Sequence, residues 1–556
     1  MNKTGEIIDS ILIERGFLSE EERKEFLTDK PKKTYDPYLL PDIEEGTDFL
    51  YSALNEGEHI CIYGDYDVDG IMSTVLLCSF LRYLTSLGLS ASTIDWYIPS
   101  RFDEGYGLNC GALDTIRERG AALVITVDCG SVSKSEIEYA KTIGLDVIVT
   151  DHHQCSAPLL PDCPVINPSR GDSNYPFSYL SGCGVAFKAM QAFRLKYYPE
   201  NDTIRNFLND TLDLVALATV ADVVPLIDEN RTLVKYGINA INSRKRTSLA
   251  NLNEMIRIDS ENVTSMDIGY RIGPHINAAG RLDDASQVIE LFLTKDESRM
   301  KAIISELISL NTERKRVQDL AEKECIDLVC SKHADENFLL LRPSNIHEGV
   351  SGIVAGRIRA RFNRPTAILA LSEDGNLKGS ARSTPEVDII ALLRRHESSF
   401  LKLGGHAMAA GFTFLKENEN LLRTELNSDV DEMLKENPQL FAEDLSYDAE
   451  LSPSELSLEL AEMMLLFEPT GTQNLTPCLL ITNPDISNIK FIGTDGRHLS
   501  FMTDGIRCVF FNPDEDSIRI IQESNNIELY AELSINKWNG HQNIQLTVKK
   551  VRYRRG

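Results

Sequence analysis

Three apolar runs in the first half of the chain constrain its fold more than any other feature. They are HICIYGD (59–65), ALVITVD (122–128) and DVIVTD (146–151), and each of them ends in an acid. Runs that are apolar throughout are typical of parallel strands buried on both faces, and the segments between these runs have helical patterns. We therefore predict an α/β domain with a parallel sheet over residues 46–230.

The rest of the chain divides into four further segments. Residues 1–45 form a predicted N-terminal helical leader, and residues 231–332 form a helical connector. The connector ends in a predicted long helix, because its last part lacks Pro and Gly and has apolar residues at helical spacing. Strand and helix signals resume over 333–430 as a second α/β domain. Six short strands separated by turn signals predict a small β-barrel over 445–556.

Composition excludes some classes of protein. The net charge of −27 over 556 residues argues against a protein that coats duplex DNA through a basic face. It does not exclude a nuclease that confines its Lys and Arg to a channel. The sequence has no apolar run of about 18 residues and no signal-peptide pattern, so we expect a cytoplasmic protein without a membrane span. The 11 cysteines form no CxxC pair, which favours reduced thiols over a disulfide framework or a zinc site.

The segment from Gly64 to Gly70 concentrates negative charge directly after the first strand. Asp65, Asp67 and Asp69 alternate within five residues, where uncompensated carboxylates would repel one another. A divalent cation removes that repulsion, and carboxylate oxygens suit Mg²⁺ and Mn²⁺. A calcium-binding loop or a solvated acidic loop are the alternatives. An EF-hand is disfavoured, because a strand precedes the loop and no Glu stands at the twelfth position.

Other strand ends carry matching groups. Asp128 ends the second run, and Asp151 with His152 and His153 ends the third. Ligands of open α/β sheets bind beyond the carboxyl ends of the strands, so these groups are expected at one edge. Asp222 lies in the apolar stretch LVALATVADVVPL, where a charge needs a partner. Two metals bridged by a shared carboxylate activate a water and stabilise charge at a phosphoryl centre, so we predict phosphoester hydrolysis.

Together, DYDVDG, VDCG, TDHH and the aspartate of ADVV resemble the four motifs of the DHH phosphoesterase superfamily. Further motifs are similar to those of the RecJ family of exonucleases: YIPSR (97–101), EGYGL (104–108), GPHINAAGR (273–281), GSARS (379–383) and GGHAMAAG (404–411). The last of these is the hallmark of the DHHA1 domain. The strand-rich tail with KWNG (537–540) resembles the oligonucleotide-binding (OB) barrel of that family. The resemblance covers essentially the whole chain.

The resemblance implies a DHH domain at 46–230, a DHHA1 domain at 333–430 and an OB-like barrel at 445–556. It implies a 5′→3′ exonuclease that degrades single-stranded DNA to mononucleotides in DNA repair and recombination. The implied cofactor is Mn²⁺ or Mg²⁺ in a two-metal centre. The implied partners are single-stranded DNA, single-strand-binding protein and a RecQ-type helicase, and we expect a monomer.

The resemblance also implies roles for single residues. The metal ligands are Asp65, Asp67, Asp69, Asp128, His152 and Asp222, and the catalytic group is Asp128, His152 and His153, with His153 near the scissile phosphate. The substrate-binding residues are Arg101, His153, Arg281, Ser380, Arg382, Gly404, Gly405, His406 and Trp538. These roles agree with the chemistry of the residues. Glycines permit the backbone to approach a phosphate closely, and arginines can donate two hydrogen bonds to its oxygens. The alternatives are surface salt bridges for the arginines and barrel core for Trp538.

The chain departs from the family pattern at three places. His275 stands where Arg is usual, Ala381 stands where Gly is common, and FEPTGTQNLTP (467–477) departs from the glycine- and proline-rich pattern that precedes the barrel in the family, which bears on the docking of the barrel. Two other functions stay open. A DHH nanoRNase or cyclic-dinucleotide phosphodiesterase is disfavoured by the residues after 450, because such enzymes usually lack the barrel. A DNA-binding scaffold without nuclease activity is disfavoured by the intact acids.

Overall fold

The computed structural model describes residues 3–101, 104–105, 107–258, 262–344, 346–372, 374–442, 446–493, 496–523, 526–538 and 541–554, apart from the side chains of 157, 537 and 538. The chain forms two compact units. The first unit comprises Met1–Asn277, Ala285–Ile304 and Ser446–Gly556, and the second comprises Ala278–Asp284 and Ser305–Leu445. Each unit is described by itself.

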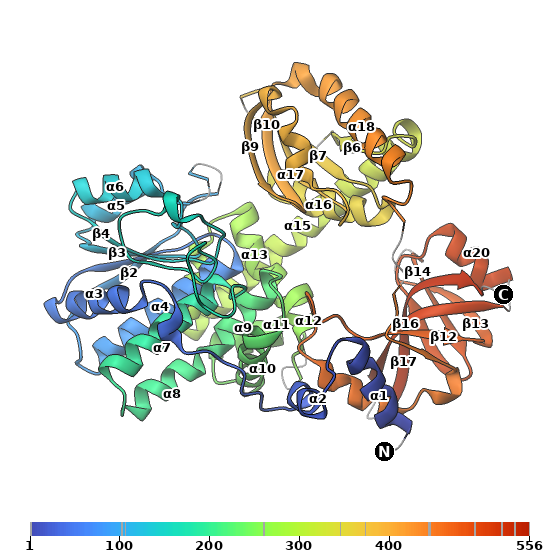
Figure 1. Ribbon diagram of the computed structural model, residues 1–556, viewed down its shortest axis with the longest axis horizontal. Helices are drawn as coiled ribbons and strands as arrows, with labels where there is room; N and C mark the ends of the chain where they lie inside the picture. The colour runs from blue at the N-terminus through green and yellow to red at the C-terminus, as the bar shows by residue number, and fades with distance from the viewer. Residues whose placement is uncertain are drawn as a thin grey trace. The chain divides into compact units, whose positions relative to one another are not determined.

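A five-stranded parallel sheet organises the first unit, with the strand order β2-β1-β3-β4-β5 (Figure 1). The strands are β1 (Ile60–Tyr63), β2 (Ile94–Tyr97), β3 (Leu123–Val127), β4 (Asp146–Thr150) and β5 (Val165–Ile166). The three apolar runs of the sequence form β1, β3 and β4, which are neighbours in the sheet. The prediction of an α/β fold with a parallel sheet is therefore confirmed.

Helices cover both faces of this sheet. Buried side chains of α5 and α6 pack with Cys61, Tyr63 and Val124 on one face. Helices α3, α4 and α7 pack together and contact the strands from the other face. The helices are α3 (Ile43–Glu56), α4 (Val68–Ser86), α5 (Cys110–Glu118), α6 (Lys134–Thr142), α7 (Gly182–Tyr197), α8 (Asp202–Asp210), α9 (Leu212–Ala221) and α10 (Asp228–Asn242).

Helix α4 is the longest apolar helix of the first unit. In the described part of the chain it is the one helix that is long and apolar enough to cross a membrane by length and composition. In this fold 78% of its apolar window is buried, because α4 packs against α7, α9, β1 and β2. Its hydrophobicity is therefore explained by its position in the core of the sheet domain.

A helical region follows the sheet domain. Its elements are α11 (Thr247–Met255), α12 (Ser265–Asp267), the π-helical turn η3 (Ile268–Ile272), α13 (Gly273–Leu282), α14 (Ser286–Leu293) and α15 (Glu297–Lys332). Helix α15 is 36 residues long and ends at Lys332, so it forms the last part of the connector, where the sequence predicts a long helix. The predicted linking helix is confirmed.

The second unit contains a five-stranded mixed sheet with the order β6-β7-β8-β10-β9. Only β6 and β7 pair in parallel, and the other pairs are antiparallel. Side chains of α15 and α16 pack on one face of the sheet, and those of α17 and α18 pack on the other. The elements are β6 (Leu339–Leu341), α16 (Glu348–Phe362), β7 (Thr366–Leu371), β8 (Leu377–Arg382), α17 (Ile389–Arg394), β9 (Phe400–His406), β10 (Ala409–Phe414) and α18 (Glu419–Glu436).

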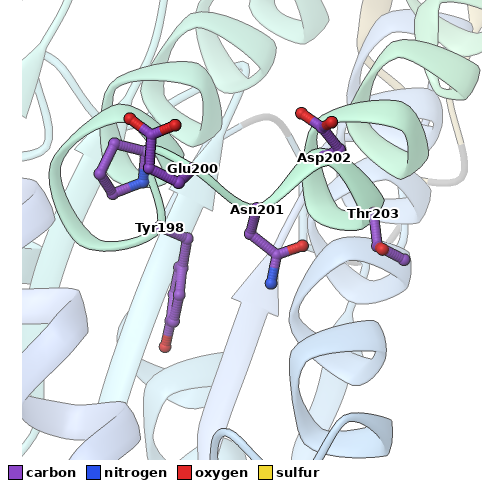
Figure 2. Close-up of a pocket in the computed structure, with 6 residues that line it drawn as sticks. Tyr198, Glu200, Asn201, Asp202 and Thr203 are labelled. Carbon is purple, nitrogen blue, oxygen red and sulfur yellow. The ribbon is translucent and has the colours of Figure 1, made fainter.

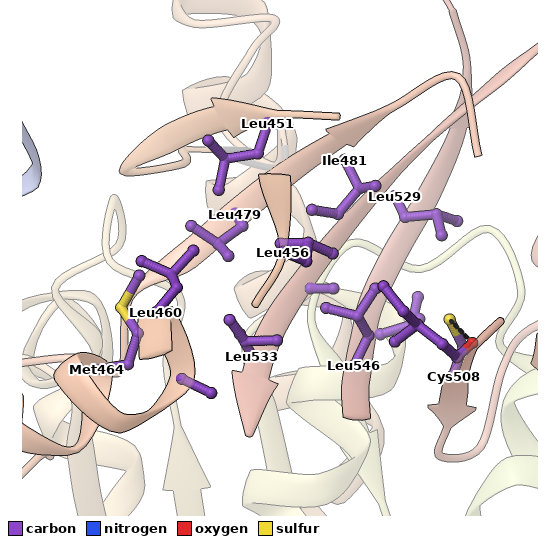
Figure 3. Close-up of a cluster of buried hydrophobic side chains, with 14 of the residues drawn as sticks. Leu451, Leu456, Leu460, Met464, Leu479, Ile481, Cys508, Leu529, Leu533 and Leu546 are labelled. Carbon is purple, nitrogen blue, oxygen red and sulfur yellow. Dashed lines mark hydrogen bonds between the residues drawn. The ribbon is translucent and has the colours of Figure 1, made fainter. Parts of the chain in front are cut away.

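The C-terminal part of the first unit is a seven-stranded sheet with the order β11-β12-β16-β17-β15-β14-β13. All six strands predicted from the sequence after residue 445 are present. The elements are β11 (Ala449–Leu451), α19 (Leu458–Met464), β12 (Cys478–Thr482), β13 (Ile486–Ile492), β14 (His498–Thr503), β15 (Ile506–Phe510), α20 (Glu515–Glu523), β16 (Ile527–Trp538) and β17 (His541–Tyr553). Leucines of β12, β16, β17 and α19 fill its core (Figure 3).

The N-terminal leader packs into this C-terminal core. The leader contains α1 (Lys3–Glu14) and α2 (Glu20–Leu27). Ile8, Ile11, Leu12 and Phe26 of these helices are buried in the same cluster as the leucines of Figure 3. Outside the core, the Arg15 guanidinium donates to the Asp448 carboxylate at 2.6 Å. The two ends of the chain therefore share one hydrophobic core, which local sequence patterns cannot predict.

Arg231 connects α10 to the leader and to the C-terminal domain. Its side chain is 5% exposed and donates hydrogen bonds of 2.8–3.3 Å to four backbone carbonyls, those of Phe26, Leu466, Phe467 and Pro469. The guanidinium also lies 3.9 Å from the centre of the Phe26 ring. Burial lowers the pKa of Arg231 to about 10. Two of these carbonyls belong to the stretch 467–477, which therefore makes this contact although it departs from the family pattern.

Replacing Arg231 with Met should lower the free energy of unfolding by about 3 kcal/mol, because several buried carbonyls lose their donors at once. Urea denaturation and limited proteolysis of the C-terminal domain would measure the loss. Arg205→Met is the matched control, since the Arg205 side chain is 51% exposed and pairs only with Asp202 on its own helix. Equal stability of the two variants would contradict a structural role for Arg231.

Candidate metal centre and phosphate-binding residues

The seven acids and histidines of the predicted cluster lie together at the carboxyl edge of the parallel sheet. Asp65 and Asp67 follow β1, and Asp69 lies in the first turn of α4. Asp128 follows β3, His152 and His153 follow β4, and Asp222 is the C-cap of α9. Because β1, β3 and β4 are adjacent, their carboxyl ends place these side chains at one point of the fold.

The cluster contains two sets of candidate metal ligands that share no residue, and a third group, Asp128, His152 and His153, overlaps both. One set is Asp65, Asp67 and Asp128, and the other is Asp69, His152 and Asp222; within each set the ligand atoms lie within 4.8 Å of one another. The two sets meet where His152 Nε2 lies 3.1 Å from Asp128 Oδ1. The same nitrogen lies 3.7 Å from Asp222 and 3.8 Å from Asp69. Oxygen-rich sets of this kind suit Mg²⁺ or Mn²⁺.

The backbone around the first motif is held by its own carboxylates. Asp67 is the N-cap of α4, and its Oδ1 accepts from the backbone N–H groups of Asp69 and Gly70 at 2.9 and 3.1 Å. A side chain at Gly70 would approach the Asp65 backbone nitrogen to 2.5 Å, so only glycine fits there. Asp65 is buried, and its Oδ1 accepts no hydrogen bond from the described residues. An unsatisfied buried carboxylate oxygen fits a metal ligand.

Asp69 is fixed by the start of α7. Its two oxygens accept from the backbone N–H groups of Gly182 and Cys183 at 2.6 and 2.7 Å. A side chain at Gly182 would lie 2.8 Å from the Asp128 Cβ, so this glycine lets α7 approach the cluster. Asp128 itself has φ of 61°, a left-handed conformation that is uncommon for a residue other than glycine. Strain of this kind gathers at functional sites, where the surroundings hold it.

Asp151 orients both histidines. Its Oδ1 accepts from the backbone N–H groups of His152 and His153, and lies 2.8 Å from His153 Nδ1. Its Oδ2 accepts from the Ser131 N–H at 3.0 Å. The Nδ1 of His152 lies 3.1 Å from the Leu180 carbonyl, which directs Nε2 towards the carboxylates. The sequence marked Asp151 as part of the motif but assigned it no role, since only the structure shows this positioning.

A second positioning residue comes from the GPHINAAGR motif. The side-chain oxygen of Asn277, on α13, accepts from the Val68 N–H at the start of α4 at 3.2 Å. The contact links a distant motif to the DYDVDG loop. The motif was recognised in the sequence, but its amino-acid pattern did not indicate that the Asn277 side chain faces this loop.

Electrostatics make the metal-free cluster unfavourable. Burial raises the pKa of Asp65, Asp69, Asp128 and Asp222, and the charge of neighbouring carboxylates raises it further. Burial acts to lower the pKa of His152, but the charges of Asp69 and Asp222 outweigh it and raise the pKa. So many carboxylates beside one imidazole leave an excess of negative charge, which divalent cations would neutralise.

Arg101 lies at the edge of the cluster. Its guanidinium is 5.1 Å from the centre of the Tyr66 ring, and its charge lowers the pKa of Asp65, against the larger effect of burial. The structure thus places the predicted Arg101 beside the first motif.

The predicted phosphate-binding residues of the second unit gather at the start of α16. Arg281 Nη1 donates to the Gly349 carbonyl in the first turn of α16 at 2.9 Å. A side chain at Gly352 would meet Arg382 Nη2 at 2.8 Å and Ser380 Oγ at 3.0 Å, so both groups lie against this helix. A helix N-terminus flanked by two arginines and a serine is a favourable site for a phosphate.

The sheet register extends this group across three strands. Ala409 on β10 pairs with Arg382 on one side and with His406 on the other, so these residues share one row and one face. In the next row of that face, Gly411 pairs with Ser380 and with Gly404. Gly404, His406 and Gly411 are exposed, which leaves a surface of bare backbone beside the arginine.

Gly405 has a different role from its neighbour. Its φ is +146°, and a side chain there would lie 2.4 Å from the Ala409 carbonyl oxygen, so this glycine permits the tight pairing of β9 and β10. Nothing lies within 4 Å of a side chain built at Gly404. Gly404, not Gly405, therefore offers open space on this face.

Three further residues from the sequence analysis are Trp538, Ala381 and His275. The side chain of Trp538 lies outside the described residues, and its backbone ends β16. The side chain of Ala381 is buried in the core on the opposite face from Ser380 and Arg382, so the methyl group that replaces glycine points away from the arginine, whose Nη1 donates to the Ala381 carbonyl at 2.8 Å. The His275 ring nitrogen Nδ1 lies 2.5 Å from the Arg271 carbonyl one turn earlier.

A surface pocket of about 480 Å³ lies at the turn between α7 and α8 (Figure 2). Its lining residues, 198–203, include the carboxylates of Glu200 and Asp202 and none of the predicted site residues. An anionic substrate would be repelled there, so this pocket is not the candidate site.

Comparison with known proteins places the chain in a family. The DHH family N-terminal domain matches residues 59–219, the DHHA1 domain matches 335–435, and the RecJ OB domain matches 447–550. The single-stranded-DNA-specific exonuclease RecJ of Escherichia coli (strain K12) is 34% identical over 537 residues, which cover 92% of this chain and 90% of that protein. The chain belongs to the RecJ family. The predicted DHH, DHHA1 and OB domains are thereby confirmed in kind and order.

Two other RecJ proteins extend the comparison. The RecJ exonuclease of Bacillus subtilis (strain 168) is 33% identical over 552 residues, which cover 98% of this chain and 67% of that protein. A crystal structure of RecJ in complex with Mn²⁺ from Thermus thermophilus has a TM-score of 0.80 and 27% identity, and the match covers 99% of this chain and 76% of that one.

The raised carboxyl pKa values predict a pH-dependent effect of metal. Where the folded protein binds more protons than the unfolded chain, stability falls as pH rises, so the metal-free protein should be less stable at pH 8 than at pH 6. Mn²⁺ at about 100 times its dissociation constant at pH 6 should stabilise the protein by about 2.7 kcal/mol at that pH, and the same Mn²⁺ concentration should stabilise it more at pH 8, where fewer protons compete for the carboxylates. Thermal unfolding with EDTA or with Mn²⁺ measures this.

Asp128→Asn is the matched variant, because it removes a charge from the cluster. It should melt at a higher temperature than wild type without metal and should gain less from Mn²⁺. A rise in melting temperature with Mn²⁺ that is no larger at pH 8 than at pH 6 would contradict the electrostatic account.

Proposed function

We propose that this protein is a metal-dependent exonuclease that hydrolyses single-stranded DNA in the 5′→3′ direction and releases mononucleotides. The observation that carries the proposal is the division of six acids and histidines into two ligand sets that meet at Asp128 and His152. The RecJ relatives are named single-stranded-DNA-specific exonucleases, and a RecJ relative binds Mn²⁺ in a crystal structure.

The proposed ligands are Asp65, Asp67 and Asp128 for one ion and Asp69, His152 and Asp222 for the other. Bound Mn²⁺ or Mg²⁺ ions supply an activated water and neutralise the charge that develops on the phosphate oxygens. Asp128 lies where the two sets meet. His153 is held through Nδ1 by Asp151, so its Nε2 is the nitrogen that can donate to a phosphate oxygen.

The direction of digestion is proposed to come from the second unit. Arg281, Ser380 and Arg382 at the start of α16 would bind a terminal 5′-phosphate, with His406 and Gly404 on the same sheet face beneath the strand. Two arginines and a helix N-terminus supply charge-assisted donors that a terminal phosphate, with its additional charge, uses better than an internal one.

The match to the RecJ OB domain over 447–550 favours this function over a nanoRNase or cyclic-dinucleotide phosphodiesterase. The complete ligand sets disfavour a scaffold without nuclease activity. We further propose action in DNA repair and recombination, as a cytoplasmic monomer that cooperates with single-strand-binding protein and a RecQ-type helicase. These partners follow from the family resemblance.

Asp128→Asn should lower the rate of digestion of 5′-labelled single strands by at least roughly 10³-fold in Mn²⁺ or Mg²⁺, because Asp128 is a ligand of one set and lies 3.1 Å from His152 of the other. Release of labelled mononucleotide measures this. Asp162→Asn is the control, since the Asp162 side chain is 92% exposed and lies on the surface. Full activity of Asp128→Asn, or equal digestion of blunt duplex by wild type, would refute the proposal.

Arg382→Ala should raise KM for 5′-phosphorylated strands by about 10-fold or more and bring it close to the KM for 5′-hydroxyl strands, since a hydrogen bond to a charged group contributes about 1.5–3 kcal/mol. Matched strands with and without the 5′-phosphate measure this ratio. Arg395→Ala is the control, because the Arg395 side chain is 51% exposed and pairs with Asp429. An unchanged preference in Arg382→Ala would exclude this residue from 5′-end recognition.

A further inference from the structure

Two exposed apolar residues without an assigned role are neighbours in sequence of groups that contact His152 of the metal-ligand cluster. Tyr179 is 50% exposed and Val223 is 67% exposed. Tyr179 precedes Leu180, whose carbonyl holds His152 Nδ1 at 3.1 Å. Val223 directly follows Asp222, whose carboxylate lies 3.7 Å from His152 Nε2. Both residues are therefore one position away from a group that contacts His152.

Buried Asn230 ties the two segments together. Its side-chain amide donates to the Tyr179 carbonyl at 2.6 Å and to the Pro225 carbonyl at 3.0 Å. One fully buried side chain thus fixes the backbone next to Tyr179 and the backbone two residues after Val223. The two segments that carry Tyr179 and Val223 are therefore joined through Asn230 rather than being independent loops.

Val223 occupies a strained position. Its φ is 60°, in the left-handed region, where a β-branched residue is an outlier. It is the first residue after the C-cap of α9, a place that usually carries glycine. An exposed valine gains little from burial to offset this strain. Backbone strain without a compensating gain in packing is typical of residues at ligand-binding sites.

Tyr179 is held as a fixed aromatic surface. Its ring lies edge-on to the ring of buried Phe177, with the centroids 5.8 Å apart and an interplanar angle of 68°. Half of Tyr179 remains exposed beside this contact. A half-exposed aromatic ring with a fixed orientation is suited to stacking on a flat ligand.

We propose that Tyr179 and Val223 form an apolar subsite for the base and deoxyribose of the nucleotide whose phosphate lies at the metal-ligand cluster. This inference rests on the proposed nuclease function. The cluster supplies only carboxylates and imidazoles, which suit cations and phosphate oxygens, so the apolar part of a nucleotide needs other partners. Stacking on an aromatic ring requires an unpaired base, and the subsite would therefore contribute to selection of single strands.

The test is a cycle of two variants and two substrates. The substrates are 5′-phosphorylated single strands that carry either normal bases or abasic residues at the two 5′-terminal positions. With wild type, removal of these bases should raise KM by about 10-fold, within the range expected for loss of base stacking. Tyr179→Ser should raise KM for the normal strand to a similar extent and should add little further loss on the abasic strand.

Two further variants separate a binding role from a structural one. Tyr179→Phe keeps the ring and should retain the KM of wild type. Val223→Gly should weaken binding of the normal strand several-fold and raise the melting temperature by about 1–3 °C, because it relieves the left-handed strain. Tyr236→Ser, which changes an exposed tyrosine of α10, should leave KM unchanged.

Mn²⁺ binding by calorimetry should be equal in wild type and in Tyr179→Ser, which shows that the cluster is intact. The subsite would be overturned if Tyr179→Ser left KM unchanged. It would also be overturned if the increases in KM caused by Tyr179→Ser and by base removal multiplied, as independent effects do. A wild-type protein that degrades neither substrate with Mn²⁺ or Mg²⁺ would instead refute the proposed function. Binding of the two strands to Asp128→Asn by fluorescence anisotropy would then still test the subsite, and equal affinities would overturn it.

Discussion

The repulsion among buried carboxylates is the interaction on which the rest of this structure depends. Asp65, Asp69 and Asp128 are almost fully buried: ligand oxygens of Asp65 and Asp128 lie within 4.8 Å of each other, and oxygens of Asp69 and Asp128 lie 3.8 and 3.1 Å from His152 Nε2. Such an arrangement opposes folding unless cations or hydrogen-bond donors compensate it. Much of the surrounding fold can be understood as the means of holding these charges in place.

Backbone N–H groups provide part of that compensation. The start of α7 donates two of them to Asp69, and the start of α4 donates two to Asp67. These donors carry the partial positive charge of helix N-termini, so they stabilise the carboxylates and fix their direction together. Asp128 adopts a left-handed backbone, and its Oδ1 lies 3.1 Å from His152 Nε2, where the two ligand sets meet.

The sequence predicted the parts of the site that depend on local pattern. Each apolar run that ends in an acid predicted both a buried strand and the side chain placed at its end, and β1, β3 and β4 carry them as expected. Contacts over long distances in the sequence escaped prediction. The shared core of Ile8 with the C-terminal strands and the four carbonyls around Arg231 depend on tertiary packing, which leaves no periodic signal. The same holds for Asn277, whose partner lies 209 positions away.

The chemistry of the reaction and the choice of substrate are divided between different residues. A centre built from carboxylates and imidazoles distinguishes phosphoesters poorly, because it contacts only ions and phosphate oxygens. Selection must therefore come from groups that contact other parts of the substrate: arginines for a terminal phosphate and apolar side chains for a base. The acidic net charge of −27 strengthens this requirement, since the protein surface as a whole repels DNA and only a strand held at several such points overcomes the repulsion.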